Sequence, residues 1–182
     1  MKNSPDIKII IVNTNDKDYL KNCLVSLVRQ KTENLQLEIV VVDNGSTDGS
    51  RQLIETRFPQ VKWIQNGTNL LYTKANNRGL KQASGKYFLV LNPDTTLPPT
   101  TLKRMYSFID ANKKIGLAGC RQINEWGKIL PICHRYFTPY TQILTLPLFY
   151  KFAKNSAAFR NFTYADWDRL SSREVDTIPG SF

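Results

Sequence analysis

Apolar and polar positions alternate in blocks along the first two thirds of the chain. Four short apolar runs, rich in β-branched or aromatic residues, are typical of strands that are covered on both faces of a sheet. A fifth apolar run follows them. The expected strands are Ile7–Val12, Leu37–Asp43, Val61–Ile64, Tyr87–Leu91 and Ile115–Cys120.

The stretches between these runs carry apolar residues at helical spacing. In the first stretch, Leu20, Leu24 and Leu27 share one helical face. The expected caps are Asn15 or Asp16 for the first helix and Ser46 or Thr47 for the second. Two further helices are expected over Lys74–Ala83 and around Thr101–Asn112. Strands that alternate with helices indicate an α/β fold, with a Rossmann-like, mostly parallel sheet and helices on both faces.

The alternation of strands and helices ends after Arg121. The segment "INEWGKILPI" predicts a hairpin that turns at Trp126-Gly127. Residues 140–159 are apolar and helix-prone, with an interruption at Pro147, and they suit packing onto the main domain, a partner or a membrane surface. The segment "REVDTIPGSF" resembles the start of a further strand. We therefore divide the chain into an α/β domain, 1–120, and a partial C-terminal appendage, 121–182.

The net charge of +10 is concentrated in one part of the chain. Residues 51–136 hold 14 Lys and Arg against 4 Asp and Glu, a balance that favours polyanions or an anionic membrane surface. Nucleic acid is not expected, because neither a zinc finger nor an RNP-like aromatic motif is present. No apolar run approaches the ~18 residues that span a bilayer, and the N-terminus does not resemble a signal peptide. We expect a cytoplasmic chain with three reduced cysteines.

Polar residues follow three of the expected strands, at Asn13–Asn15, Asp43–Asp48 and Asn92–Asp94. If the first and fourth strands are neighbours where the strand order reverses, these clusters share the crevice in which open parallel sheets bind ligands. A carboxylate beside an amide oxygen suits Mg²⁺ or Mn²⁺ shared with a substrate diphosphate. We expect Asp43 to accept hydrogen bonds from a base or ribose and not to support folding. A turn or helix cap is the alternative for each aspartate, and we favour it for Asp48.

The segments "VVVDNGSTDGS" and "ANNRGLKQASGKYFLVLNPDT", with "SLVRQ" ahead of them, resemble family 2 glycosyltransferases of the GT-A fold, and most closely the rhamnosyltransferase-like branch. This resemblance implies inverting, metal-assisted transfer of a sugar, with rhamnose as one expectation, from a UDP- or dTDP-linked donor. The acceptor would be a saccharide or lipid-linked molecule in cell-surface polysaccharide synthesis, with peripheral contact at the inner membrane face.

By the same resemblance, Asn92-Pro93-Asp94 stands where the family has its Asp-x-Asp motif, so Asp94 would be the metal ligand and Asn92 replaces the first aspartate. The residues expected near the nucleotide are Asn13, Thr14, Asn15, Asp43, Asn44, Lys74, Asn76, Asn77 and Asn92.

Two features depart from the family pattern. Leu71-Tyr72 replaces the usual Gly-Phe, and the chain stops before the acceptor region, whose Glu-Asp pair carries the catalytic base. The expectation is therefore a truncated enzyme, with an inactive nucleotide-sugar-binding module as the alternative. A sugar nucleotidylyltransferase is a second alternative, but "NTNDKD" lacks the glycines of its basic loop. His134 is expected to be structural.

Overall fold

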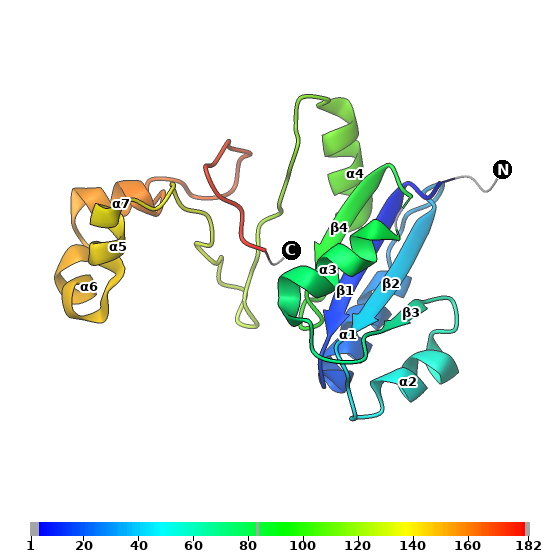
Figure 1. The fold of residues 1–182 in the computed structure, drawn as a ribbon. Helices are drawn as coiled ribbons and strands as arrows, with labels where there is room; N and C mark the ends of the chain where they lie inside the picture. Colours follow the sequence, from blue (N-terminus) through cyan, green and yellow to red (C-terminus); the bar gives the residue numbers. More distant parts are fainter. Residues whose placement is uncertain (1–3, 83, 181–182) are drawn as a thin grey trace. The chain divides into compact units, whose positions relative to one another are not determined.

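The structure is a computed structural model that describes residues 4–82 and 84–180. The chain divides into two compact units, the first ending at Gly116 and the second comprising Leu117–Gly180. The N-terminal unit contains the sheet, and the C-terminal unit contains three short helices (Figure 1).

The sheet of the N-terminal unit has four parallel strands in the order β3-β2-β1-β4. They are β1 (Ile7–Asn13), β2 (Leu37–Asp43), β3 (Lys62–Gln65) and β4 (Tyr87–Leu91). Because β1 pairs with both β2 and β4, the strand order reverses beside β1, as expected. The register places Asn13 opposite Asp43, so the polar residues that end these two strands meet at the carboxyl edge of the sheet.

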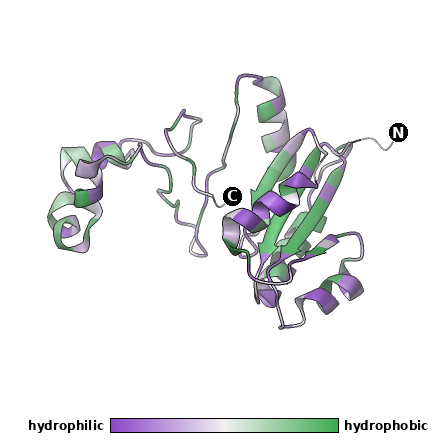
Figure 2. Cartoon of the chain, viewed as in Figure 1, coloured by the Kyte–Doolittle hydropathy of each residue, from purple (hydrophilic) through white to green (hydrophobic). Residues whose placement is uncertain are grey.

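Helices cover both faces of this sheet. On one face, α1 (Lys17–Val28), α2 (Ser50–Arg57) and α4 (Thr101–Ala111) enclose a core with the inward side chains of the strands. The other face is covered by α3 (Leu71–Lys81), whose Ala75 packs with Ile10, Val40 and Val42. Figure 2 shows the strands as the most hydrophobic part of this unit. Burial on both faces explains why the strand sequences lack alternation.

Close packing of α3 depends on Gly79. A Cβ atom at this position would lie 2.7 Å from Ile10 Cγ2 and 3.1 Å from Val42 Cγ2, both within the core. The missing side chain therefore lets α3 approach β1 and β2, which fixes the height of the helix above the sheet.

The first two helices share a cap that differs from the expected ones. Asp16 occupies the N-cap position of α1 without a side-chain hydrogen bond, and α2 starts after Gly49, which has a φ of +83°. Both first-turn amides instead donate to Asp48, from Lys17 N at 2.8 Å and from Ser50 N at 3.0 Å. The expected caps of α2 were wrong, whereas the expectation that Asp48 is a cap is confirmed.

Two other expectations need correction. Ile115–Cys120 forms no strand in the described part of the chain; Ile115 N instead closes a turn onto Asn112 O, and Leu117 is 73% exposed. Apolar composition does not make a strand without a neighbouring strand to pair with. The third helix begins at Leu71, three residues earlier than expected, and the expected end at Ala83 lies outside the described residues.

The C-terminal unit holds α5 (Pro139–Thr145), α6 (Pro147–Ala153) and α7 (Ala157–Phe162). The expected hairpin is a tight turn with one antiparallel bridge, Ile123 to Ile129. A second bridge joins His134 to Thr177. Apart from this bridge, the described residues of "REVDTIPGSF" form no strand. Among the described residues, no helix combines the length and apolar character needed to cross a membrane.

Candidate functional site

A hydrogen-bonded cluster lies where β1 and β2 end. The Asn13 side chain is fully buried, and its amide donates to Asp43 Oδ1 at 3.0 Å and to Ser46 Oγ at 2.9 Å. Asn15, with a φ of +55°, accepts from Thr47 N at 2.8 Å and donates its own backbone N–H to Ser46 Oγ. The loop after β1 and the loop after β2 are thereby joined.

Asp43 is the centre of this cluster. Its side chain has no exposed surface, and its two oxygens accept five hydrogen bonds. The donors are the Asn13 and Gln65 amides, the Ser46 hydroxyl and the backbone N–H groups of Gly45 and Ser46. Burial raises the pKa of this carboxyl, but the hydrogen bonds outweigh burial and hold the pKa below its ordinary value. The carboxylate is therefore ionised and occupied by protein donors.

These contacts bear on the role expected for Asp43. A carboxylate offers about four lone-pair positions, and five donors already use them in this structure. Direct contact with a base or ribose stays a prediction, and it requires one of these donors to move aside.

The ends of β2 and β3 are linked to α3 through Asn44 and two residues that sequence reasoning missed, Asn66 and Arg78. Asn44 Oδ1 accepts from Asn66 Nδ2 at 2.8 Å, and Asn66 Oδ1 accepts from Arg78 at 2.7 Å. Asn44 and Asn66 are both buried. Sequence reasoning also missed Gln65, which donates to Asp43. Gln65 and Asn66 directly follow the third expected strand, so the same search of strand ends would have found both.

Asn92 and Asp94 follow β4. The Tyr72 hydroxyl donates to Asn92 Oδ1 at 3.2 Å, which ties the first turn of α3 to the end of this strand. Asp94 is exposed, and the hydrogen bond that it accepts from the hydroxyl of its neighbour Thr95 is long, at 3.5 Å. Burial, and then the negative charge of Asp94, raise the pKa of the Cys23 thiol to about 12. Asp94 is therefore accessible to solvent and close to the buried face of α1.

The described residues contain no cluster of three or more His, Cys, Asp or Glu side chains that could enclose a metal ion. A hard cation shared with substrate phosphates needs fewer protein ligands, often one or two carboxylates. Asp94, with the amide oxygen of Asn92 nearby in sequence, fits that sparser arrangement.

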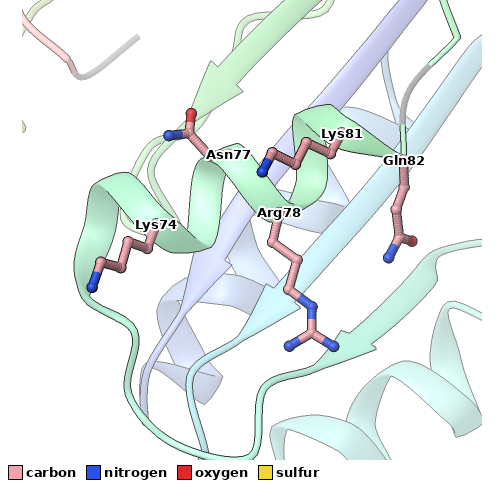
Figure 3. Close-up of a pocket in the computed structure, with 5 residues that line it drawn as sticks. All are labelled: Lys74, Asn77, Arg78, Lys81 and Gln82. Carbon is pink, nitrogen blue, oxygen red and sulfur yellow. The ribbon is translucent and has the colours of Figure 1, made fainter.

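The residues expected on α3 separate into two groups. Asn76 is buried, and its amide donates to Tyr72 O at 3.0 Å. Lys74 and Asn77 line a groove of about 400 Å³ on the outer side of the helix (Figure 3). The other residues that line the groove are Arg78, Lys81 and Gln82. No hydrogen bond joins Lys74 or Asn77 to the strand-end cluster in the described residues, and Thr14 lies half-buried beside that cluster.

Several sequences resemble the chain. An "Uncharacterized glycosyltransferase" of Haemophilus influenzae is 30% identical over 122 residues, which are 65% of this chain and 37% of that protein. The succinoglycan biosynthesis protein ExoO of Rhizobium meliloti is 28% identical over 165 residues, covering 88% of this chain and 46% of ExoO. The chain thus spans less than half the length of these relatives.

The fold is also similar to that of a solved structure. Crystal structures of Staphylococcus aureus TarS 1–349, alone and in complex with UDP, match with a TM-score of 0.55 and 32% identity. The match covers 59% of this chain and 33% of TarS. This likeness confirms the expected α/β, GT-A-type fold. The model of the family "Glycosyl transferase family 2" matches residues 8–170, and the chain therefore belongs to glycosyl transferase family 2.

Proposed function

We propose that the N-terminal unit binds the donor of a sugar-transfer reaction, a nucleoside diphosphate sugar, at the carboxyl edge of its sheet, with Asp94 as the protein ligand of a Mg²⁺ or Mn²⁺ ion. The observation that carries this proposal is the exposed Asp94 carboxylate after β4, next to the strand beside which the order reverses. Open parallel sheets bind ligands at this point.

The nucleoside lies along the loops after β1 and β2, with Asn13, Thr14, Asn15, Asp43 and Asn44 forming its side of the site. Asn92 and the α3 residues Lys74, Asn76 and Asn77 lie toward the phosphates, where a cation such as Lys74 favours negative charge. When bound, the ion stabilises charge on the departing diphosphate. One of the TarS crystal structures is a complex with UDP, which supports UDP as the first nucleotide to test.

The finer assignments follow the family resemblance. The donor is UDP- or dTDP-linked, with rhamnose as the first sugar to test, and transfer is inverting. The acceptor is a saccharide or lipid-linked precursor of a cell-surface polysaccharide, reached from the cytoplasmic side of the membrane. The name of ExoO, a succinoglycan biosynthesis protein, supports the general class of product.

Calorimetry with UDP and dTDP, with and without Mn²⁺, tests the donor site. Asp94→Ala should reduce metal-dependent nucleotide binding at least about ten-fold, since hydrogen-bond and charge contacts of a carboxylate contribute ~1.5–3 kcal/mol. Asp18→Ala, which removes another exposed carboxylate from the same unit, should bind like the parent chain. Equal affinity for Asp94→Ala and the parent would overturn the assignment.

A binding module without transferase activity is the second candidate, and the contacts of the late aspartates favour it. Asp166 pairs with Arg173, Asp168 accepts from Leu170 N, and Asp176 accepts from the Tyr164 hydroxyl. His134 is held by Thr177 and stacks on Phe162, as expected of a structural histidine. Turnover of a nucleotide sugar near one per second, a common enzyme rate, would exclude this second candidate.

A further inference from the structure

Large apolar side chains are exposed on α5, on α6 and at the residue between the two helices. No residue of α5 is buried, and Ala153 is the buried residue of α6. The exposed fractions reach 75% for Leu148 and 81% for Phe152. We call this set the α5–α6 surface; its members are Tyr140, Ile143, Leu146, Leu148, Phe149 and Phe152.

The exposure is a consequence of how the three helices are held together. Tyr150 contacts Phe159 edge-to-face with ring centroids 5.5 Å apart, and Phe159 and Phe137 both contact the ring of buried Phe162. Thr138 caps α5, and a proline begins both α5 and α6. The inner side of the helices is therefore already used by a ring cluster. The α5–α6 surface is the outer side of an ordered element.

The charged residues along this stretch of the sequence are all basic. No Asp or Glu occurs between Glu125 and Asp166 in the sequence. Lys151, Lys154 and Arg160 are exposed, and none forms an ion pair within the described part of the chain. Apolar and aromatic side chains interspersed with uncompensated cations are typical of helices that lie in the plane of an anionic lipid interface.

We propose that the α5–α6 surface docks on an anionic lipid bilayer. Leu148, Phe149 and Phe152 enter the boundary between acyl chains and headgroups, while Lys151 and Lys154 contact lipid phosphates. Contact is in the plane of the membrane, because no described helix can cross it. An apolar protein partner or a second copy of the chain would also cover the apolar side chains. The absence of acidic residues over this length favours an anionic surface over either one.

Vesicle sedimentation of the full chain tests the proposal. Binding to phosphatidylcholine vesicles that contain about one third phosphatidylglycerol should exceed binding to pure phosphatidylcholine, and salt should weaken it. Leu148→Glu should lower the partition coefficient at least about ten-fold. The change removes a leucine that the lipid would bury and adds a negative charge that anionic lipids repel. The matched control is Leu170→Glu, at 69% exposure in the same unit, which should bind like the parent.

A second pair of variants tests each half of the surface. Phe152→Ser removes an apolar contact without adding charge and should also weaken binding. Lys151→Gln should weaken binding to anionic vesicles about five-fold and leave binding to neutral vesicles unchanged. Circular dichroism establishes that each variant is folded.

Two results would overturn the proposal. One is equal binding of the parent chain to neutral and anionic vesicles, or none to either. The other is a parent chain that is dimeric by light scattering and becomes monomeric in Leu148→Glu with no change in vesicle binding, which would identify the surface as a contact between copies.

Discussion

Asp43→Ala should destabilise the N-terminal unit by about 3 kcal/mol, although the position was expected from sequence to serve nucleotide binding. Of the five donors that point at the carboxylate, the Asn13 amide belongs to a buried residue and the Ser46 backbone N–H to a half-buried one. Each loses a charged acceptor worth ~1.5 kcal/mol or more. Gly45 and Gln65 are exposed, so water can replace the carboxylate for them and they add little.

Urea unfolding measures this difference. Trp63 donates to Gln65, which in turn donates to Asp43, so Trp63 fluorescence reports on the cluster in a Trp126→Phe, Trp167→Phe background. With a typical slope of ~2 kcal/mol per molar urea, the midpoint should fall by about 1.5 M. Asp94→Ala is the control on the neighbouring strand end, and it should shift stability by less than about 0.5 kcal/mol.

The same two variants separate folding from binding. A midpoint for Asp43→Ala that equals the Asp94→Ala midpoint, together with a large loss of nucleotide affinity, would refute the structural reasoning. That result would return Asp43 to the role expected from the sequence.

Two further predictions concern packing and capping. Gly79→Ala should destabilise the unit by ~1–3 kcal/mol, because its Cβ would overlap Ile10 in the core; thermal unfolding checks this, with Lys81→Ala on the same helix as control. Asp48→Ala should cost ~1–2 kcal/mol through the lost caps of α1 and α2, measured by urea unfolding against Asp18→Ala. Burial raises the pKa of Asp48, but hydrogen bonds from Ser50 and backbone amides hold it below its ordinary value, as for Asp43. The stability from both carboxylates is therefore present above their unfolded pKa of about 4 and should be lost as pH falls below it. The free energy of unfolding of Asp48→Ala should therefore fall less in acid than that of the parent chain.

Much of the fold could be predicted because local pattern and long-range pairing agree. β-branched runs such as Ile7–Val12 and Leu37–Asp43 are apolar for the same reason that they are central strands, so the pattern identified them and placed Asn13 and Asp43 at their ends. Ile115–Cys120 is also largely apolar but has no partner strand in the described structure, and pairing is not visible in a single sequence.

The contacts within the site were harder to predict than its position. Whether Asp43 faces a ligand or the protein depends on the conformation of the Gly45–Ser46 turn, which brings two backbone N–H groups to one oxygen. The contact between Asp48 and the first turn of α1 was missed for a related reason. Asp48 lies 31 residues from Lys17 in sequence, and the rules for helix caps consider only near neighbours.

The contacts of α3 determine which changes in chain length this unit can tolerate. Tyr72, in the first turn, is bonded to Asn92 after β4, and Arg78 is bonded to Asn66 after β3. The six intervening residue steps, a rise of about 9 Å, join the loops that follow the two outermost strands of the sheet. One inserted residue between these contacts would rotate Arg78 by about 100° around the helix relative to Tyr72, so both contacts could not form together. Insertions and deletions in natural or designed relatives should therefore fall outside Tyr72–Arg78. This segment of α3 can then serve as a reference of constant length when their sequences are aligned.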